Sequence, residues 1–266
     1  MRAVLLLAVA AGLAATAVPA ALARARWCTR RPAVALALWC ATWAGGLAAA
    51  GAAGVGALAH ALAGAGTAGT GTAGTGALCC SPWCWVLCWA GLAATGAALA
   101  LVLARSEPLA AGHRRTADLL ASLAGATAYR HESAGGISVV FVDSDRPLAL
   151  SLPGPDPRVL VTSRLEDELT GAQLRAVIAH ERAHLTGRHG WITLLAQLNA
   201  ACTPGLPAAR QFRRASRLLV ELIADDAATH ACGGTHLAEA LTTLAALEGE
   251  QGLLLRARRA AGPSRR

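Results

Sequence analysis

The sequence predicts a protein in two parts, an α-helical membrane region followed by an α+β domain. Three observations predict this class: an uneven distribution of charge, long apolar runs near the N-terminus, and short β-rich runs followed by helical patterns. Residues 1–105 contain six arginines and no acidic residue, whereas all 16 acidic residues of the chain follow residue 105. We therefore predict a transmembrane region over residues 1–105 and a second domain over residues 106–266.

Three apolar runs are long enough to form transmembrane helices. They cover residues 3–23, 33–63 and 83–104, and about 20 apolar residues suffice to cross a hydrocarbon core of about 30 Å. The first run could instead be a signal peptide, because AVPAALARA near its end offers small residues in an A-x-A pattern. The arginines that follow it, Arg24, Arg26, Arg30 and Arg31, favour an anchor whose trailing end stays in the cytoplasm.

The arginines also predict the orientation of the membrane region. Residues 24–32 are Arg-rich and are expected in the cytoplasm, whereas the uncharged residues 64–82 are expected outside. Arg105, Arg114 and Arg115 then return the chain to the cytoplasm, which predicts a multi-pass protein of the cell membrane. The net charge of +8 does not indicate nucleic-acid binding, because 18 arginines balance the 16 acidic residues after residue 105.

The eight cysteines do not form the paired hooks of a structural zinc site. Four cluster within residues 79–88, where Cys84 and Cys88 lie inside an apolar, Trp-rich run and are expected to pack as small hydrophobic side chains. Cys79 and Cys80 precede this run, and a disulfide of either one outside the membrane stays an open alternative. Cys202 and Cys232 are expected to be free thiols in a reducing compartment.

The second domain opens with an amphipathic segment over about residues 113–125 and continues with three β-rich runs. The runs ISVVFV, LALSL and RVLVTS cover residues 137–142, 148–152 and 158–163. Prolines between these runs indicate turns or the edge of a sheet. Residues 191–202 are apolar but are expected to form a buried or membrane-surface helix rather than a fourth span.

A capping-box pattern at Thr170 and Gln173 predicts a helix over about residues 171–188 that ends near Gly187 or Gly190. This helix would carry the motif HERAH, residues 180–184.

Within that motif, His180 and His184 are four residues apart, so both imidazoles lie on one helical face and can share a metal ion. Glu181 falls on the apolar stripe of the helix, which Leu174, Ile178 and Leu185 form. A carboxylate on a core-facing stripe is costly unless something uses it, and here it can serve as a general base.

A catalytic zinc ion takes three protein ligands, so a third is needed. The segment LLVELIADDAATH, residues 218–230, places Glu221 and Asp225 one turn apart in a run otherwise rich in leucine. Glu221 is the candidate third ligand, and Asp225 the candidate acceptor for the free ring N–H of a ligand histidine. The alternative is an ordinary amphipathic helix whose acidic residues face water.

The segments HERAH and ELIADDAA resemble those of the gluzincin metallopeptidases, most of all the membrane-bound BlaR/MecR type, with the HtpX-type proteases as relatives. The resemblance covers roughly residues 106–245 and the multi-span N-terminal region. It implies a zincin-like (gluzincin) catalytic domain that faces the cytoplasm. It also implies zinc ligands His180, His184 and Glu221, base Glu181 and supporting Asp225.

The implied activity is that of a zinc metalloendopeptidase acting on cytoplasmic or membrane-adjacent proteins, in regulatory proteolysis. A protein or peptide substrate and the lipid bilayer are the expected partners, and an extended substrate segment would pair with an edge strand at residues 148–152. Two departures qualify the resemblance. In the HtpX type a second acidic residue usually stands two residues after the ligand Glu, whereas this chain has Ile223 there. The chain also has no lysine, which a penicillin-binding sensor domain needs, so no such domain is expected.

Two alternatives stay open, a catalytically silent zinc-fold protein that acts as a regulatory binding partner and a membrane protein without zinc. Against the second, His60 is the only ionisable side chain of the three apolar runs apart from cysteines, whereas transport paths usually need such groups. His189 either supports the ligands or is exposed. His230 and His236 are either donors that stabilise the oxyanion of peptide hydrolysis or surface residues.

Overall fold

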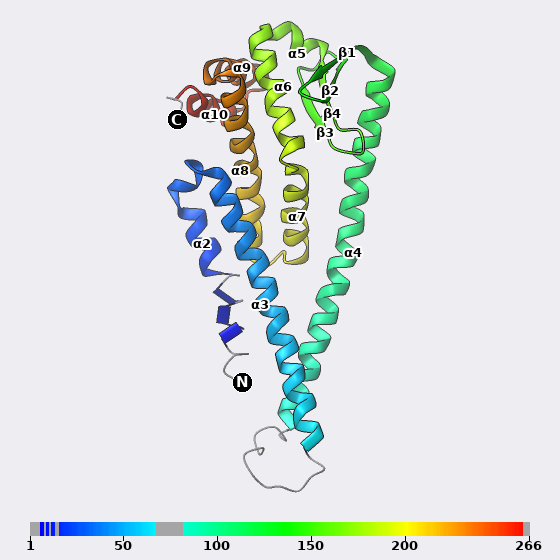
Figure 1. The fold of residues 1–266 in the computed structure, drawn as a ribbon, viewed down its shortest axis with the longest axis vertical. Helices are drawn as coiled ribbons and strands as arrows, with labels where there is room; N and C mark the ends of the chain where they lie inside the picture. The colour runs from blue at the N-terminus through cyan, green and yellow to red at the C-terminus, as the bar shows by residue number, and fades with distance from the viewer. Residues whose placement is uncertain (1–5, 8, 11, 14–15, 68–81, 263–266) are drawn as a thin grey trace. The chain divides into compact units, whose positions relative to one another are not determined.

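The computed structural model describes residues 6–7, 9–10, 12–13, 16–67 and 82–262 (Figure 1). The chain divides into two compact units. One combines Met1–Cys28, Val34–Pro108 and Gln197–Ala215, and the other combines Thr29–Ala33, Leu109–Ala196 and Ser216–Arg266. The predicted domain boundary at residue 105 falls inside one continuous helix, α4 (Pro82–Thr127), and stays a prediction.

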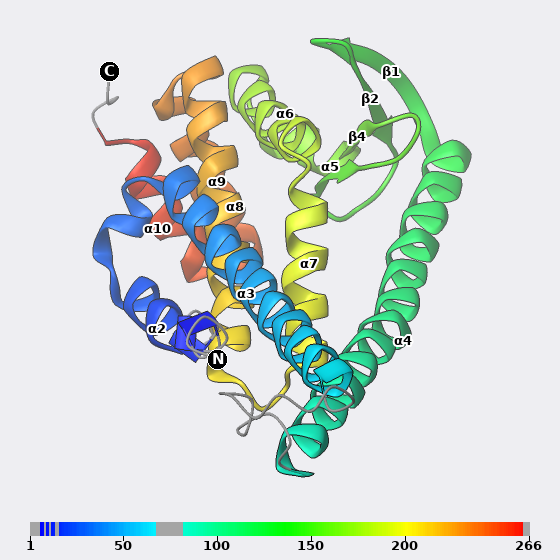
Figure 2. The same ribbon diagram turned by 60° about the horizontal axis from the view of Figure 1, so that its bottom comes forward.

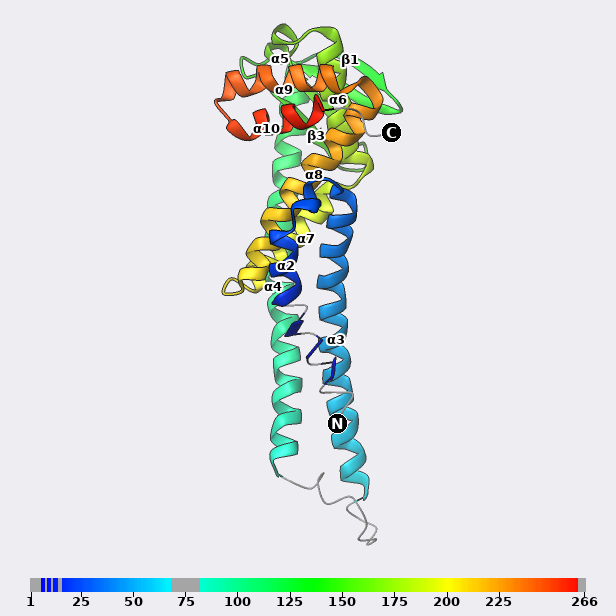
Figure 3. The same cartoon turned by 90° about the vertical axis from the view of Figure 1, so that its left-hand side faces the viewer.

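The first unit is helical. The helices α2 (Ala17–Arg24) and α3 (Pro32–Thr67) are joined by a short 3-10 helix, Arg26–Thr29, and lie side by side (Figure 3). Trp39 of α3 stacks on Phe212 with ring centroids 5.6 Å apart. These two rings border a mostly apolar cavity of about 390 Å³ within this unit.

One helix of the described part is long and apolar enough to cross a membrane, judged by length and composition alone. It is Pro32–Gly56 within α3, which overlaps the predicted span over 33–63. Only 17% of the most apolar 18-residue stretch of this helix is buried, whereas the core helix of a soluble protein would be mostly buried. The other two spans stay predictions, because residues 3–23 lie partly outside the described residues and 83–104 form part of the longer α4.

The second unit contains a four-stranded sheet of order β1-β2-β4-β3. Its strands are β1 (Ala128–Ala134), β2 (Ile137–Val142), β3 (Ala149–Leu152) and β4 (Arg158–Thr162). β2 runs parallel to β4 and antiparallel to β1, and β3 pairs antiparallel with β4 at the sheet edge. The three predicted β-rich runs are thus confirmed, whereas β1 was missed, because its sequence AYRHESA is polar and largely exposed.

Both faces of the sheet are covered, which explains why β2 and β4 are mostly apolar. Val139, Phe141, Val159 and Val161 pack against α5 (Ser163–Glu168) and α6 (Gly171–Thr186). The alternate residues Val140, Val142 and Leu160 pack against Ala124 and Leu120 near the end of α4. The period-two alternation of side chains therefore buries most of β2 and β4 on one side or the other, and Ile137, Ser138 and Arg158 are half-buried. Figure 2 shows the sheet between α6 and the end of α4.

Helix α6 begins and ends as the sequence predicts. The Thr170 side chain accepts a hydrogen bond from the backbone N–H of Gln173 at 3.4 Å, and the Gln173 side chain accepts one from the backbone N–H of Thr170 at 2.9 Å. Gly187 caps the C-terminal end. The predicted helix over 171–188 is therefore confirmed, and with it the reciprocal cap that satisfies two free backbone donors.

Four further helices follow α6. They are α7 (His189–Cys202), α8 (Pro207–Cys232), α9 (Gly234–Glu248) and α10 (Gln251–Ala260). With 14 residues, α7 is about 21 Å long and too short to span a bilayer, as predicted. α9 and α10 share a core with α6 and the end of α8. Cys202 and Cys232 are free thiols, as predicted, whereas the side chains of the four cysteines at 79–88 lie outside the described residues.

Candidate metal centre

Two neighbouring turns of α6 and one turn of α8 bring His180, His184 and Glu221 together. The Nε2 atoms of the two histidines are 3.1 Å apart. Glu221 Oε2 lies 3.4 Å from His180 Nε2, and Glu221 Oε1 lies 3.5 Å from His184 Nε2. In a tetrahedral zinc site with bonds of about 2.0–2.1 Å, neighbouring ligand atoms are about 3.3 Å apart. These residues could hold a zinc ion as they stand.

Asp225 lies behind His180, where the sequence predicts it. Its Oδ1 atom is 3.0 Å from His180 Nδ1, and its side chain is only 1% exposed. Burial disfavours the charged form of His180, but the contacts with Asp225 and Glu221 outweigh it and raise the pKa of His180 to about 9. Burial acts against the Asp225 carboxylate as well, yet Arg256 and His180 hold the pKa of Asp225 at about 2.

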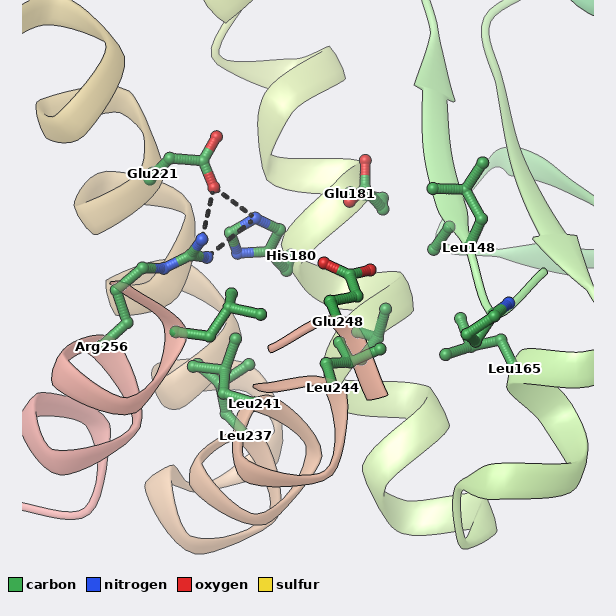
Figure 4. A pocket seen from close by; sticks show the side chains of 14 residues that line it. Leu148, Leu165, His180, Glu181, Glu221, Leu237, Leu241, Leu244, Glu248 and Arg256 are labelled. Carbon is green, nitrogen blue, oxygen red and sulfur yellow. Dashed lines mark hydrogen bonds and ion pairs between the residues drawn. The ribbon is translucent and has the colours of Figure 1, made fainter. Parts of the chain in front are cut away.

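Glu181 lies beside the histidines, between His180 and Leu148 (Figure 4). Burial raises the pKa of Glu181, while the positive charge of His180 and hydrogen bonds with Ser151 of β3 partly offset this rise. A carboxyl group with a raised pKa exchanges protons more readily near neutral pH, as a general acid–base group must. The position on the core-facing stripe of α6 thus gives Glu181 a property that an exposed glutamate lacks.

The sequence left the role of His189 open, and the structure places it against His184. His189 is 4% exposed, and its Nδ1 atom lies 3.0 Å from His184 Nδ1. Burial and the neighbouring His180 lower the pKa of His184, and burial lowers the pKa of His189. His230 and His236 are exposed and do not line the cavity at this centre, so neither is placed to act on a substrate there.

Arg256 of α10 is part of the centre and was missed by the sequence analysis. Its Nε and Nη2 atoms donate to the two oxygens of Asp225 at 2.8 and 2.7 Å, and Nη1 lies 2.9 Å from Glu221 Oε2 (Figure 4). The surrounding sequence, LLLRARRA, gave no signal, because Arg258 and Arg259 beside it are typical of the polar face of an amphipathic helix.

A cavity of about 150 Å³ opens beside these residues. Its polar lining comprises His180, Glu181, Glu221, Glu248 and Arg256, and its apolar wall includes Leu148, Leu165, Leu237, Leu241 and Leu244 (Figure 4). The cavity therefore joins the candidate metal ligands and the candidate base to an apolar space that can receive a side chain.

A comparison with known protein families found one match. Residues 113–229 match the family model of peptidase family M48. The match spans α6 and the part of α8 that carries Glu221, and it ends before α9 and α10. M48 peptidases are zinc-dependent, so this match supports a zinc metallopeptidase that acts on proteins or peptides. Comparisons with curated proteins and with solved structures gave no match.

Proposed function

We propose that this protein is a membrane-anchored zinc endopeptidase that cuts cytoplasmic or membrane-adjacent proteins, in regulatory proteolysis of the kind carried out by BlaR/MecR-type peptidases. The observation that carries the proposal is the arrangement of His180, His184 and Glu221, whose ligand atoms all lie within 4.8 Å of one another beside the half-buried Glu181. The closest contacts among the three side chains, 3.1–3.5 Å, match the separation of neighbouring ligand atoms in a tetrahedral zinc site.

In this proposal His180, His184 and Glu221 hold the zinc ion, and Asp225 orients His180. When bound, the ion supplies a Lewis acid that polarises the peptide carbonyl and makes a water molecule acidic. Glu181 accepts the proton from the attacking water and passes it to the amine that leaves. Its raised pKa suits both halves of this transfer, since the same group first takes up and then releases the proton.

The substrate segment would pair with β3 at the sheet edge. The backbone N–H of Thr162 donates to the carbonyl of Leu148 at 3.0 Å, so residues 148, 150 and 152 direct their backbone groups toward β4. The backbone groups of Ala149 and Ser151 then face away from β4. Those of Ala149 are available to an added strand, whereas a backbone group of Ser151 already hydrogen-bonds with Glu181. An extended, locally unfolded segment with one apolar side chain in the leucine-lined cavity is the substrate that fits.

The membrane part of the proposal has three spans and a cytoplasmic catalytic domain. It is supported by the apolar helix Pro32–Gly56 and by the arginines that flank the predicted spans. A peptidase held in this way would meet substrates at or near the inner face of the membrane.

The first experiment measures zinc per chain in the detergent-purified protein, with Glu221→Ala, His184→Ala and the exposed-site control His230→Ala. About one zinc per chain, lost in the first two variants and kept in the control, is expected. Absence of zinc from the reconstituted wild type would refute the proposal.

Glu181→Gln then separates a protease from a catalytically silent zinc-fold partner. A protease should keep its zinc and lose turnover in this variant, so that bound substrates accumulate and can be identified. In a silent binding protein, Glu181→Gln would leave the cellular phenotype unchanged.

A further inference from the structure

We propose that His189 is a positioning residue that accepts the ring N–H of His184 and so fixes the orientation of that ligand. This inference rests on the proposed function, in which His184 binds zinc. His189 itself does not reach the cavity beside the centre, so it would act only through His184.

The two ring nitrogens of His184 have different surroundings. Its Nε2 atom faces His180 and Glu221, whereas its Nδ1 atom lies 3.0 Å from His189 Nδ1, with the two rings nearly perpendicular at 88°. Two nitrogens at this distance must share one hydrogen. If His184 uses Nε2 as a ligand, the hydrogen sits on its Nδ1, and His189 Nδ1 is the acceptor.

The turn between α6 and α7 is built to place this ring. Gly187 caps α6, Arg188 adopts a left-handed conformation with φ of 50°, and His189 begins α7. A Cβ atom on Gly187 would lie 2.5 Å from His189 Nε2 and 2.9 Å from the carbonyl of Ala183. Only glycine leaves room there for the imidazole, so the five-residue spacing between the histidines depends on Gly187.

A neutral acceptor suits this position. His180 is already supported by the charged Asp225, and Glu181 and Glu221 add two more carboxyl groups to the same centre. A fourth carboxyl group behind His184 would add like-charge repulsion in a buried place, whereas a neutral imidazole supplies the acceptor without the charge. Partners of this kind typically contribute about 10–100-fold to metal affinity.

The test compares His189→Asn with His189→Leu in the detergent-purified full chain. Asparagine and leucine have nearly the same shape, but only asparagine puts an acceptor at the position of Nδ1. The measurements are the zinc dissociation constant, by competition with a chelator, and the absorption spectrum of the Co²⁺-loaded protein. We expect His189→Leu to bind zinc about 10–100-fold more weakly with an altered cobalt spectrum, and His189→Asn to recover most of both.

A purely structural role predicts the opposite order, because at a position that is 4% exposed leucine should be the better tolerated residue. Gly187→Ala displaces the His189 ring without removing it and should also weaken zinc binding. It replaces His189→Leu in the test if that variant does not fold. Equal zinc affinity in the two His189 variants, or unchanged affinity in Gly187→Ala, overturns the inference and leaves the proposed function standing. A wild-type chain that binds no zinc overturns both.

Discussion

Replacing Arg256 with glutamine should destabilise the metal-free protein by about 3 kcal/mol. The side chain of Asp225 is 1% exposed, and Arg256 binds both of its oxygens at 2.7 and 2.8 Å. Removing one partner of a buried ion pair leaves an uncompensated charge and costs about 3–5 kcal/mol. We take the lower end, because His180 still contacts Asp225 and glutamine can donate one hydrogen bond.

Arg259 provides a matched control on the same helix. It binds Asp226 at 2.7 and 2.8 Å, so this pair also joins α10 to α8, but the side chain of Asp226 is 51% exposed. Exposed ion pairs contribute about 0.2–1 kcal/mol. Arg259 also donates to the backbone carbonyls of Thr29 and Leu222. Even so, Arg259→Gln should reduce the free energy of unfolding by less than Arg256→Gln does, because no buried charge is left without its partner.

Both variants would be compared by denaturant titration of helical circular dichroism, in detergent with a chelator present. Added zinc should reduce the difference in free energy of unfolding between Arg256→Gln and wild type. The reason is that a bound cation replaces part of the missing positive charge near Glu221 and Asp225. Equal losses of unfolding free energy in Arg256→Gln and Arg259→Gln would refute the reasoning. They would mean that Arg256 only holds α10 against α8, as Arg259 does, and that the burial of its partner adds nothing.

Three further outcomes are expected. Burial and the hydrogen bond to Glu166 raise the pKa of Tyr129 to about 12, so the stability this pair contributes is present below pH 10 and is lost as pH rises toward 12. Tyr129 is the only tyrosine, so tyrosinate absorbance reports this pKa directly, and Glu166→Gln should bring it back toward 10. Thr170→Ala should cost about 1 kcal/mol by removing the α6 cap, whereas Thr170→Ser should not, both measured by denaturant titration. Leu165→Ala should cost about 2–5 kcal/mol in the same assay because this side chain is fully buried, and a loss below about 1 kcal/mol would contradict the described core.

The parts of the fold that the sequence predicted correctly are those set by local patterns. The capping box at Thr170 fixes the start of α6 through two bonds within four residues, and the spacing of His180 and His184 needs only the helical period. β2 and β4 were recognisable because both of their faces are buried, which makes most of each strand apolar.

What escaped prediction depends on contacts between residues far apart in the chain. β1 is polar and exists because it pairs with β2 across the turn at Gly135 and Gly136, which both have positive φ. Arg256 reaches Asp225 only because α10 buries Leu253 and Ala257 in the core shared with α9. No pattern within α10 distinguishes this arginine from its neighbours, since its partners lie on α8.

Each candidate zinc ligand is held by a residue from a different part of the chain. Asp225 lies one turn along α8 behind His180, His189 at the start of α7 contacts His184, and Arg256 on α10 contacts Glu221. Their positions are fixed by cores of their own, the sheet against α6 and the α9–α10 pair against α6 and α8. This packing brings the candidate ligand atoms to contacts of 3.1–3.5 Å. In small zinc domains the metal replaces a missing core and its binding energy is folding energy. Here the surrounding helices have cores of their own, so the fold should not depend on the metal.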